Sequence, residues 1–341
     1  MGYDNLKLEK GMYRQSGMNF TQVLESLDPS ENYRGTALEG TDAFQRQLKR
    51  FGIRAKGAGS SPVEKFFATS DSAVMFPEYI ARTVRAGMEE NDILPSIVAT
   101  TTVIDAMDYR SIYSAMEDAD KELKDVAEGA AIPTTEIKTK EHLVSLKKRG
   151  RMLVASYEAI RFQKLDLFGV MLRQIGSYIQ KMQLRDAIGV LVDGDGNGNA
   201  AEVFQPGDGI ISGEKGELTY DQLVEFWGQF DPYTMNGMIL SSGMMTRMLK
   251  VPELQNPLTG LNFQGTGVMA APLGAQLHRT SAVEEDMIIG IDSRYALEQV
   301  RAGEVLVEYD KLIDRQLERA AITAICGFGK ICDGAAKVLR V

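Results

Sequence analysis

A short acidic, glycine-rich stretch has residue types that could bind a metal ion. It reads Asp193-Gly194-Asp195-Gly196-Asn197-Gly198, which matches positions 1, 3, 5 and 6 of a calcium-binding EF-hand loop. Asp193, Asp195 and Asn197 are therefore candidate calcium ligands. The match fails at position 12, where a bidentate glutamate is required and Phe204 stands, and Pro206 occupies the place of the following helix. A tight turn is the favoured interpretation, and a calcium site is the alternative.

Nucleophilic chemistry has weaker support. Ser241-Ser242-Gly243 resembles a nucleophile elbow, but the glycine two positions before the serine is missing, so a helix N-cap explains it better. His142 and His278 have no cysteine or serine nearby in a recognisable arrangement. Cys326 and Cys332 match no redox or zinc spacing and are expected to be reduced thiols. We expect no catalytic residues, no cofactor and no enzyme activity.

Composition limits the other classes of function. The chain has 341 residues, 44% hydrophobic and 25% charged, as in ordinary soluble domains. No run of 18 apolar residues occurs and residues 1–10 are polar, so we expect neither a membrane span nor a signal peptide. A net charge of -9 argues against a dedicated nucleic-acid binder but allows a local basic patch.

One long helix must organise the fold. Apolar residues recur at steps of three and four: Leu165, Phe168, Leu172, Ile175, Ile179 and Met182. We expect a helix over 166–192 with Asp166 as N-cap, roughly 40 Å long at 1.5 Å per residue. Gly169 and Gly176, seven apart, indicate a close approach of another backbone. Gly176→Leu should then hinder folding or assembly, whereas Gly176→Ala should be mild.

The stretch 106–151 has too little apolar material to fold alone. Strand-like ends flank an acidic and lysine-rich middle. An isolated two-stranded hairpin is marginal in water. We therefore expect this excursion to lie on a neighbouring molecule.

The first 62 residues are expected to form an arm and a linker. They are polar and glycine-spotted, with one convincing helix over 41–51, and 56–62 is typical of a flexible linker. Five bases follow Gln45 without an intervening acid: Arg46, Lys49, Arg50, Arg54 and Lys56. They could contact nucleic acid or an acidic neighbouring subunit, and a solvated face is the alternative.

The remaining elements indicate a discontinuous α+β fold. We expect a helix from Pro77 to about Glu90, a strand over 97–104, and a helix begun by a Thr219/Gln222 capping box. A short strand over 238–240, a helix capped by Ser242, and strands over 287–291, 304–309 and 317–331 follow. The elements before the excursion and those at the C-terminus are therefore expected to share one core that is discontinuous in sequence.

These stretches resemble the major capsid proteins of tailed bacteriophages, which have the Hong Kong 97-type fold. The likeness is carried by Phe76-Pro77, the loop 126–133, the strand end 153–156 with Glu158-Ala159, and the long helix running into 193–198. Ile291-Asp292, 308–310, Gly327-Phe328-Gly329 and Ala336 add to it. The likeness covers 66–192 and 286–341, is weak over 199–285, and is absent over 1–60.

The resemblance implies an α+β fold with a long spine helix, a peripheral domain, an axial domain, an extended loop and an N-terminal arm. By position, the arm and linker would be 1–62, and the peripheral domain 63–105, 152–192 and 286–341. The extended loop would be 106–151 and the axial domain 193–285. In this family the extended loop lies across the neighbouring subunit, in agreement with the missing core of the excursion.

The implied function is structural. Such a protein self-assembles into pentamers and hexamers of an icosahedral phage head around non-specifically bound double-stranded DNA. It would be assembled in the host cytoplasm and reside in the virion, with scaffolding, portal and decoration proteins as further partners. Expected intersubunit contacts on the loop are Lys121, Lys124, Glu128, Ile132, Lys138 and Lys140.

Two alternatives remain open. An encapsulin-type compartment shell shares the fold, although the long arm and loop favour the phage. A calcium-binding or hydrolytic α+β protein belongs to a different class, and only a shell protein forms closed particles.

Overall fold

The computed structural model describes residues 3–14, 18–114, 125–126, 128, 137–255 and 272–341. The chain forms two compact units, each built from three segments. Unit 1 comprises Met1–Asn91, Lys148–Gln180 and Glu304–Ala324, and unit 2 comprises Asp92–Lys147, Lys181–Gly303 and Ile325–Val341. The chain passes between them within helix α7 (Leu165–Asp193) and strand β11 (Leu317–Lys330). In the described part of the chain, no helix is long and apolar enough to cross a bilayer.

In the part of unit 1 that the structure describes, helices are combined with three strands. Its helices are η1 (Tyr3–Asn5), η2 (Lys10–Arg14), α1 (Phe20–Leu27), η3 (Ser30–Tyr33), α2 (Ala43–Arg50), η4 (Val63–Phe67), α3 (Ser70–Val74), α4 (Phe76–Glu89), α6 (Tyr157–Phe162), η7 (Ile313–Arg315) and the first half of α7. Strand β4 (Lys147–Ser156), which enters unit 1 at Lys148, pairs with β11, and β11 pairs antiparallel with β10 (Leu306–Leu312).

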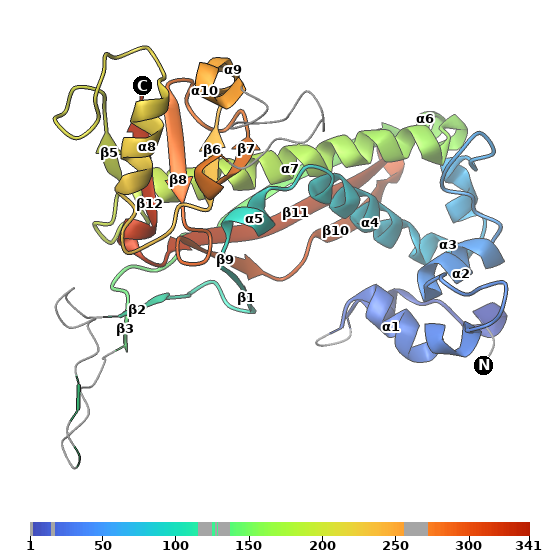
Figure 1. Cartoon of the computed structure of the whole chain (residues 1–341). Helices are drawn as coiled ribbons and strands as arrows, with labels where there is room; N and C mark the ends of the chain where they lie inside the picture. Colours follow the sequence, from blue (N-terminus) through green and yellow to red (C-terminus); the bar gives the residue numbers. More distant parts are fainter. Residues whose placement is uncertain (1–2, 15–17, 115–124, 127, 129–136, 256–271) are drawn as a thin grey trace. The chain divides into compact units, whose positions relative to one another are not determined.

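Helices α4 and α7 of unit 1 lie side by side and approach closely at two glycines (Figure 1). A Cβ atom on Gly176 would lie 2.0 Å from the Val84 carbonyl oxygen, and one on Gly87 would lie 2.1 Å from the Arg173 carbonyl oxygen. The expected close approach at Gly176 is confirmed. The expectation that Gly176→Ala is mild is wrong, because even a methyl group collides with backbone. At Gly169 the nearest atom, the Tyr79 hydroxyl oxygen, would be 3.3 Å away.

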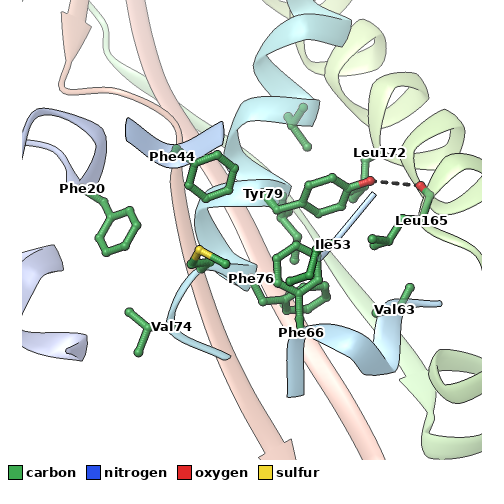
Figure 2. Packing of buried hydrophobic residues seen from close by; sticks show 14 of the residues in the cluster. Phe20, Phe44, Ile53, Val63, Phe66, Val74, Phe76, Tyr79, Leu165 and Leu172 are labelled. Atoms are coloured by element: carbon green, nitrogen blue, oxygen red, sulfur yellow. Dashed lines mark hydrogen bonds between the residues drawn. The ribbon is translucent and has the colours of Figure 1, made fainter. Parts of the chain in front are cut away.

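An aromatic cluster forms the core of unit 1 (Figure 2). The ring centroid of Phe66 lies 5.4 Å from that of Phe76 and 5.3 Å from that of Tyr79. The buried Tyr79 hydroxyl donates a hydrogen bond of 3.0 Å to the Leu165 carbonyl in the first turn of α7. Because that turn leaves amides and not carbonyls unpaired, this bond is an addition to the helix ladder that fixes the start of α7 on α4.

The N-terminal region contributes to this core and is more than a polar arm. Helices α1 and α2 both begin with capping boxes, at Asn19 and Asp42. Leu6, Leu8, Phe20, Leu24, Phe44 and Ile53 are buried in the core cluster of unit 1. Phe44 lies in the predicted helix over 41–51. The other five are irregularly spaced because they lie in short helices and turns, so their periodicity gave no signal.

Unit 2 contains most of the strands. Its helices are α5 (Leu94–Ile97), the second half of α7, α8 (Tyr220–Gly228), α9 (Ser242–Lys250), α10 (Pro252–Gln255), η6 (Pro272–Gly274) and η8 (Asp333–Ala335). One sheet has the order β5 (Glu202–Phe204), β12 (Ala336–Arg340), β8 (Met287–Ile291), β6 (Gly237–Leu240) and β7 (Gln276–Arg279). Strand β1 (Thr100–Ile104) pairs parallel with β9 (Leu297–Ala302), which pairs antiparallel with β11. Strands β2 (Ile112–Ser114) and β3 (Ile137–Thr139) form a ladder of their own.

Most element predictions are confirmed, with small corrections at helix starts. Helix α7 begins at Leu165, so Asp166 lies in its first turn and is not the N-cap. The N-cap of α9 is Ser241, not Ser242. Thr219 caps α8 through the predicted capping box.

The compact units differ from the predicted domain boundaries. Residues 92–105, 181–192, 286–303 and 325–341 were grouped with the peripheral domain, but they cluster with 193–285 in unit 2. The reason is strand pairing: the C-terminal β12 pairs with β5, and β8 pairs with β6, and both β5 and β6 lie within 193–285. Residues 1–62 likewise cluster with 63–91 in unit 1.

Candidate functional site

The excursion, residues 106–151, is the candidate interaction site. Its outgoing stem (106–114) and its returning stem (137–147) are held together at the base within unit 2. The Lys140 amide donates a hydrogen bond of 2.8 Å to the Ser111 carbonyl, and the Val144 amide donates one of 2.9 Å to the Tyr109 carbonyl. The β2–β3 ladder continues this pairing outward, with Tyr113 opposite Lys138. The predicted hairpin is thus confirmed at its base, and residues 115–124 lie outside the described part of the chain.

The outgoing stem is anchored on Glu298, a buried residue of β9. One Glu298 carboxylate oxygen accepts hydrogen bonds of 2.6 Å from the hydroxyls of Tyr109 and Thr102. The other oxygen accepts a hydrogen bond of 2.6 Å from the Ser111 hydroxyl. Burial, together with the bond to Glu298, raises the pKa of the Tyr109 hydroxyl. Charge-assisted bonds of this kind are about twice as strong as neutral ones, so they fix where the excursion leaves unit 2.

The returning stem is anchored on Asp195 by a buried lysine. The Lys140 ammonium lies 3.1 Å from one Asp195 carboxylate oxygen, and both side chains are nearly inaccessible to solvent. Lys140 also donates to the Lys330 carbonyl. Lys140 was expected to contact another subunit. That assignment is wrong for this structure, because its ammonium is committed inside its own chain.

The turn after α7 shapes this anchor through its glycines and through Asp195. Gly194, Gly196 and Gly198 adopt φ of 84°, 93° and 73°, which side-chain-bearing residues rarely adopt. Asp195 accepts hydrogen bonds from the Lys330 amide at 3.0 Å and from the Asn197 side chain at 2.8 Å. Burial alone would raise the pKa of the Asp195 carboxyl, but the bonds from Asn197, Lys140 and Lys330 outweigh it and lower that pKa.

These hydrogen bonds occupy oxygen atoms that a metal ion would need as ligands. Both Asp195 oxygens already accept hydrogen bonds from the protein, and Asp193 is exposed on the solvent side of the turn. Among the described residues, no group of three acidic, histidine or cysteine side chains could hold a metal ion. The hydrogen bonds within the chain thus favour the turn interpretation of Asp193, Asp195 and Asn197 over the calcium alternative.

A second lysine lies beneath the anchor. Lys330 is fully buried, and its ammonium donates to the carbonyls of Asn199 at 2.9 Å and Leu191 at 3.4 Å. Burial lowers the pKa of Lys330 to about 8, against the opposing charges of Asp333 and Asp195. The neighbouring Lys140 reinforces this shift. Lys330 thus links the turn, the end of α7 and the end of β11.

Two glycines of β11 let the returning stem pack closely. A Cβ atom on Gly327 would lie 2.7 Å from the Ser145 carbonyl oxygen, and one on Gly329 would lie 3.3 Å from a Val144 methyl group. Val144 is buried here. Sequence reasoning noted Gly327-Phe328-Gly329 as part of a resemblance, and its physical reason is this contact.

Beyond its anchors the excursion exposes apolar side chains. Ile112 and Ile137, at opposite ends of the β2–β3 pairing, are 56% and 69% exposed. Glu128 and Lys138, both predicted contact residues, are exposed. The other predicted contacts, Lys121, Lys124 and Ile132, lie outside the described residues. An exposed hairpin with fixed stems and apolar ends is suited to binding another surface.

Unit 1 also presents apolar side chains to solvent. One face of α7 carries Leu167, Val170, Met171 and Tyr178, all exposed, and Phe162 of α6 is 76% exposed. Their spacing of three, four and seven residues places the α7 members on one helix face. Contiguous exposed apolar surface of this kind marks interaction sites in soluble proteins.

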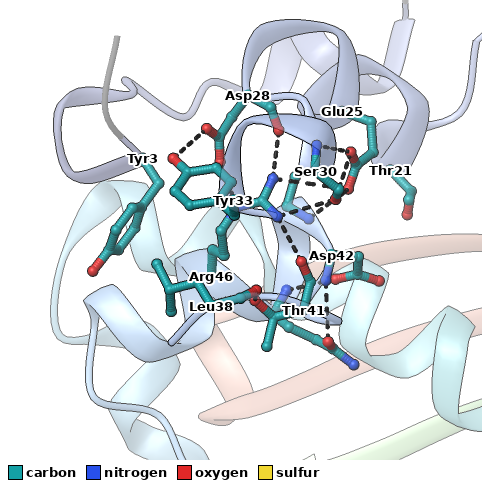
Figure 3. Close-up of polar contacts among 12 residues, drawn as sticks. Tyr3, Thr21, Glu25, Asp28, Ser30, Tyr33, Leu38, Thr41, Asp42 and Arg46 are labelled. Carbon is teal, nitrogen blue, oxygen red and sulfur yellow. Dashed lines mark hydrogen bonds and ion pairs between the residues drawn. The ribbon is translucent and has the colours of Figure 1, made fainter. Parts of the chain in front are cut away.

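The five bases of the predicted basic patch differ in burial, and Figure 3 shows the contacts of the buried one, Arg46. Arg46 is completely buried: its guanidinium lies 2.7 Å from an Asp28 carboxylate oxygen and donates to Ser30 at 3.0 Å and to the Thr41 carbonyl at 2.6 Å. It also lies over the ring of Tyr33. Arg46 is therefore a structural residue, and its assignment as a DNA or neighbour contact is wrong.

The other four bases differ from Arg46. Arg50 is half-buried and donates to the Leu6 carbonyl at 2.6 Å. Lys49, Arg54 and Lys56 are exposed, so these three keep the side-chain access that a contact would need.

The residues considered for nucleophilic chemistry have structural roles. The Ser241 hydroxyl accepts a hydrogen bond of 3.0 Å from the Met244 amide as the N-cap of α9. His278 is buried in β7, and burial lowers its pKa. Burial raises the pKa of the Cys326 thiol, which disfavours the reactive thiolate. None of these groups is arranged as a nucleophile beside a base.

Comparisons with known proteins identify the fold. Neither a scan against protein families nor a search of curated proteins finds a match. The chain resembles the virus-like particle from Pyrococcus furiosus, with a TM-score of 0.52 at 13% identity over 77% of this chain and 98% of that one. It resembles the capsid of a native GTA particle, with a TM-score of 0.53 at 13% identity over 76% and 90%.

A third solved structure agrees. A chain of Mycobacterium phage Bobi matches with a TM-score of 0.50 at 10% identity, over 73% of this chain and 90% of that one. Likeness at such identities is a likeness of fold. The chain therefore has the α+β capsid fold of the Hong Kong 97 type, as the sequence resemblance implied.

Proposed function

We propose that this chain is a major capsid protein that self-assembles into pentamers and hexamers of an icosahedral phage head around double-stranded DNA. The observation that carries the proposal is the excursion: its stems are fixed by Glu298 and Asp195, whereas Ile112 and Ile137 remain exposed. Burying the charged groups that fix the stems costs free energy, and a two-stranded hairpin alone is only marginally stable in water. Contact with another molecule would offset both costs. The capsid fold supplies that molecule as a second copy.

The exposed apolar face of α7 supports the same function. Leu167, Val170 and Met171 would be costly to leave in water, since burying each large apolar side chain contributes about 1.5–3 kcal/mol. A shell subunit covers such surfaces with its neighbours. We infer that this face and the excursion are both intersubunit surfaces.

Within this proposal the parts of the subunit have separate roles. By the resemblance, 193–285 would form the axial domain, 63–105, 152–192 and 286–341 the peripheral domain, 106–151 the extended loop and 1–62 the N-terminal arm. Parts of the peripheral segments cluster with the axial residues in unit 2, so the peripheral and axial domains do not coincide with the compact units. Lys121, Lys124, Glu128, Ile132 and Lys138 are the proposed loop contacts. Lys140 is left out because it anchors the stem.

The proposed partners follow from the shell role. Lys49, Arg54 and Lys56 are exposed bases that could contact packaged DNA or an acidic neighbour, and the net charge of -9 favours non-specific rather than dedicated DNA binding. Scaffolding, portal and decoration proteins would be further partners. Assembly would take place in the host cytoplasm, and the protein would have a structural and not an enzymatic role.

A compartment shell is the second candidate, because the solved structures of similar fold include a virus-like particle. Particle contents distinguish the two. A phage head isolated from infected or induced cells should protect double-stranded DNA from added nuclease. Particles that hold cargo protein and no protected DNA would favour the compartment.

Limited trypsin digestion tests the role of the excursion. Free subunits should be cleaved within 106–151, where Lys121, Lys124 and Lys138 supply sites, and assembled particles should be protected there. Peptide mapping by mass spectrometry locates each cut. Equal cleavage in both forms would remove the excursion as an intersubunit contact.

A further inference from the structure

Strands β4 and β10 are outer strands of the five-stranded sheet that they form with β11, β9 and β1. Among the described strands, β4 pairs with β11 alone and β10 pairs with β11 alone, so each leaves one edge without a strand partner. Strand β10 lies along β11, with Glu308 opposite Ala321 and Asp310 opposite Arg319 (Figure 1). An open strand edge presents backbone donors and acceptors to any further strand.

The two edges carry charges of opposite sign. From Lys148 to Ser156, β4 contains Lys148, Arg149 and Arg151 and no acid. Strand β10 contains Glu308 and Asp310, is preceded by Glu304, and has Lys311 as its one base. Lys148, Arg151 and Glu308 are exposed.

Each edge also exposes apolar side chains beside its charges. Met152 and Val154 of β4 are each more than half exposed, and so is Leu306 of β10. The charges could select a partner, and these apolar groups could supply buried area.

From these features we infer a head-to-tail contact between copies of this chain: the β4 edge of one subunit pairs with the β10 edge of the next. Pairing of β4 with β4, or of β10 with β10, would place like charges opposite each other, which is destabilising. The contact is therefore heterologous. A heterologous contact builds rings when its rotation closes, so this inference rests on the proposed shell function and names a contact within its rings.

Some charges on these strands already have partners in the same subunit. Asp310 lies 2.6 Å from Arg319, and Glu304 lies 2.7 Å from Arg85. Arg151 and Glu308 are therefore the positions to change, because their replacement leaves both of these ion pairs in place.

Charge exchange tests the inference. Arg151→Glu and Glu308→Lys, made singly, should each reduce the yield of closed particles at low salt by about tenfold or more, since like charges across an interface are costly. The double variant again has opposite charges on the two edges and should recover to within about threefold of wild type. Glu217→Lys and Lys250→Glu, exposed changes in unit 2, are matched controls.

Each outcome decides the question. Circular dichroism melts confirm that the variants fold. Single variants that assemble like wild type would overturn the edge pairing while leaving the shell function intact. A double variant no better than either single one would also overturn it and indicate that the edges contact another segment or protein. Failure of the wild-type chain itself to form particles would remove the shell function and this inference with it.

Discussion

The Lys140 ammonium and the Asp195 carboxylate form a buried ion pair, 3.1 Å apart, between the returning stem of the excursion and the turn after α7. These residues are 55 positions apart in the sequence. The pair explains how a hairpin with exposed apolar ends keeps a fixed base. It also defines the first prediction.

Lys140→Ala should destabilise the subunit by about 3–5 kcal/mol, because it leaves the Asp195 charge buried without its partner. Lys148→Ala, at an exposed position of β4, is the control and should cost less than about 0.5 kcal/mol. Urea denaturation of unassembled subunits measures both. Equal midpoints for the two variants would contradict the anchoring role of Lys140.

Lys330 should make stability depend on alkaline pH. Its pKa is about 8 in the folded chain and 10.5 as the reference for the unfolded chain. Between these values the unfolded state binds more protons, so stability rises with pH, by up to about 3 kcal/mol in total. Below pH 8 the folded chain carries the full cost of the buried charge.

Lys330→Met should remove this rise, whereas Lys215→Met, at an exposed position, should retain it. Denaturation curves of each variant from pH 7.5 to 11 provide the measurement. A Lys330→Met curve parallel to that of wild type would show that Lys330 does not titrate in this range.

The close crossing of α4 and α7 should reject even one methyl group. Gly176→Ala gains about 1 kcal/mol of helix propensity but overpacks against the Val84 carbonyl, so we expect a net loss of about 2 kcal/mol or more. Gly169→Ala should cost less, because its nearest neighbour, the Tyr79 hydroxyl oxygen at 3.3 Å, is a side-chain atom that has to shift by only a few tenths of an ångström. Thermal unfolding of both variants decides this, and equal melting temperatures would contradict the crossing.

Arg46 should be essential to the N-terminal region. Arg46→Ala leaves Asp28 buried without its guanidinium and should cost about 3–5 kcal/mol. Lys49→Ala, on the exposed face of the same helix, should change stability by less than about 0.5 kcal/mol. Chemical denaturation compares them. If Arg46→Ala lowered the free energy of unfolding as little as Lys49→Ala, Arg46 would be a surface base, as its sequence context indicates.

Regular periodic segments were predictable from the sequence. The helix over 166–192 follows from its three-and-four spacing, and α7 spans Leu165–Asp193. Strand β8 is a continuous apolar run buried at every position, as expected for a central strand. The Thr219/Gln222 capping box was readable because both partners are three residues apart.

The anchors of the excursion were not predictable, because their partners are far apart in the sequence. Glu298 binds Ser111 across 187 residues, and Lys140 contacts Lys330 across 190. No local pattern marks a lysine as buried. In the sequence, Lys140 cannot be distinguished from its exposed neighbour Lys138. For the same reason Arg46, held by Asp28 from 18 residues away, was grouped with surface bases.

Negative-stain electron microscopy of the purified full chain tests the shell function most directly. The protein is expressed alone, concentrated under assembly conditions and imaged without crosslinking, with the Lys140→Ala variant imaged beside it. We predict closed, regular particles tens of nanometres across for the wild-type chain. The variant should give fewer or malformed particles, because loss of the buried ion pair destabilises the subunit. A wild-type sample that remains monomeric or forms only irregular aggregates would contradict the proposal that this chain builds a capsid.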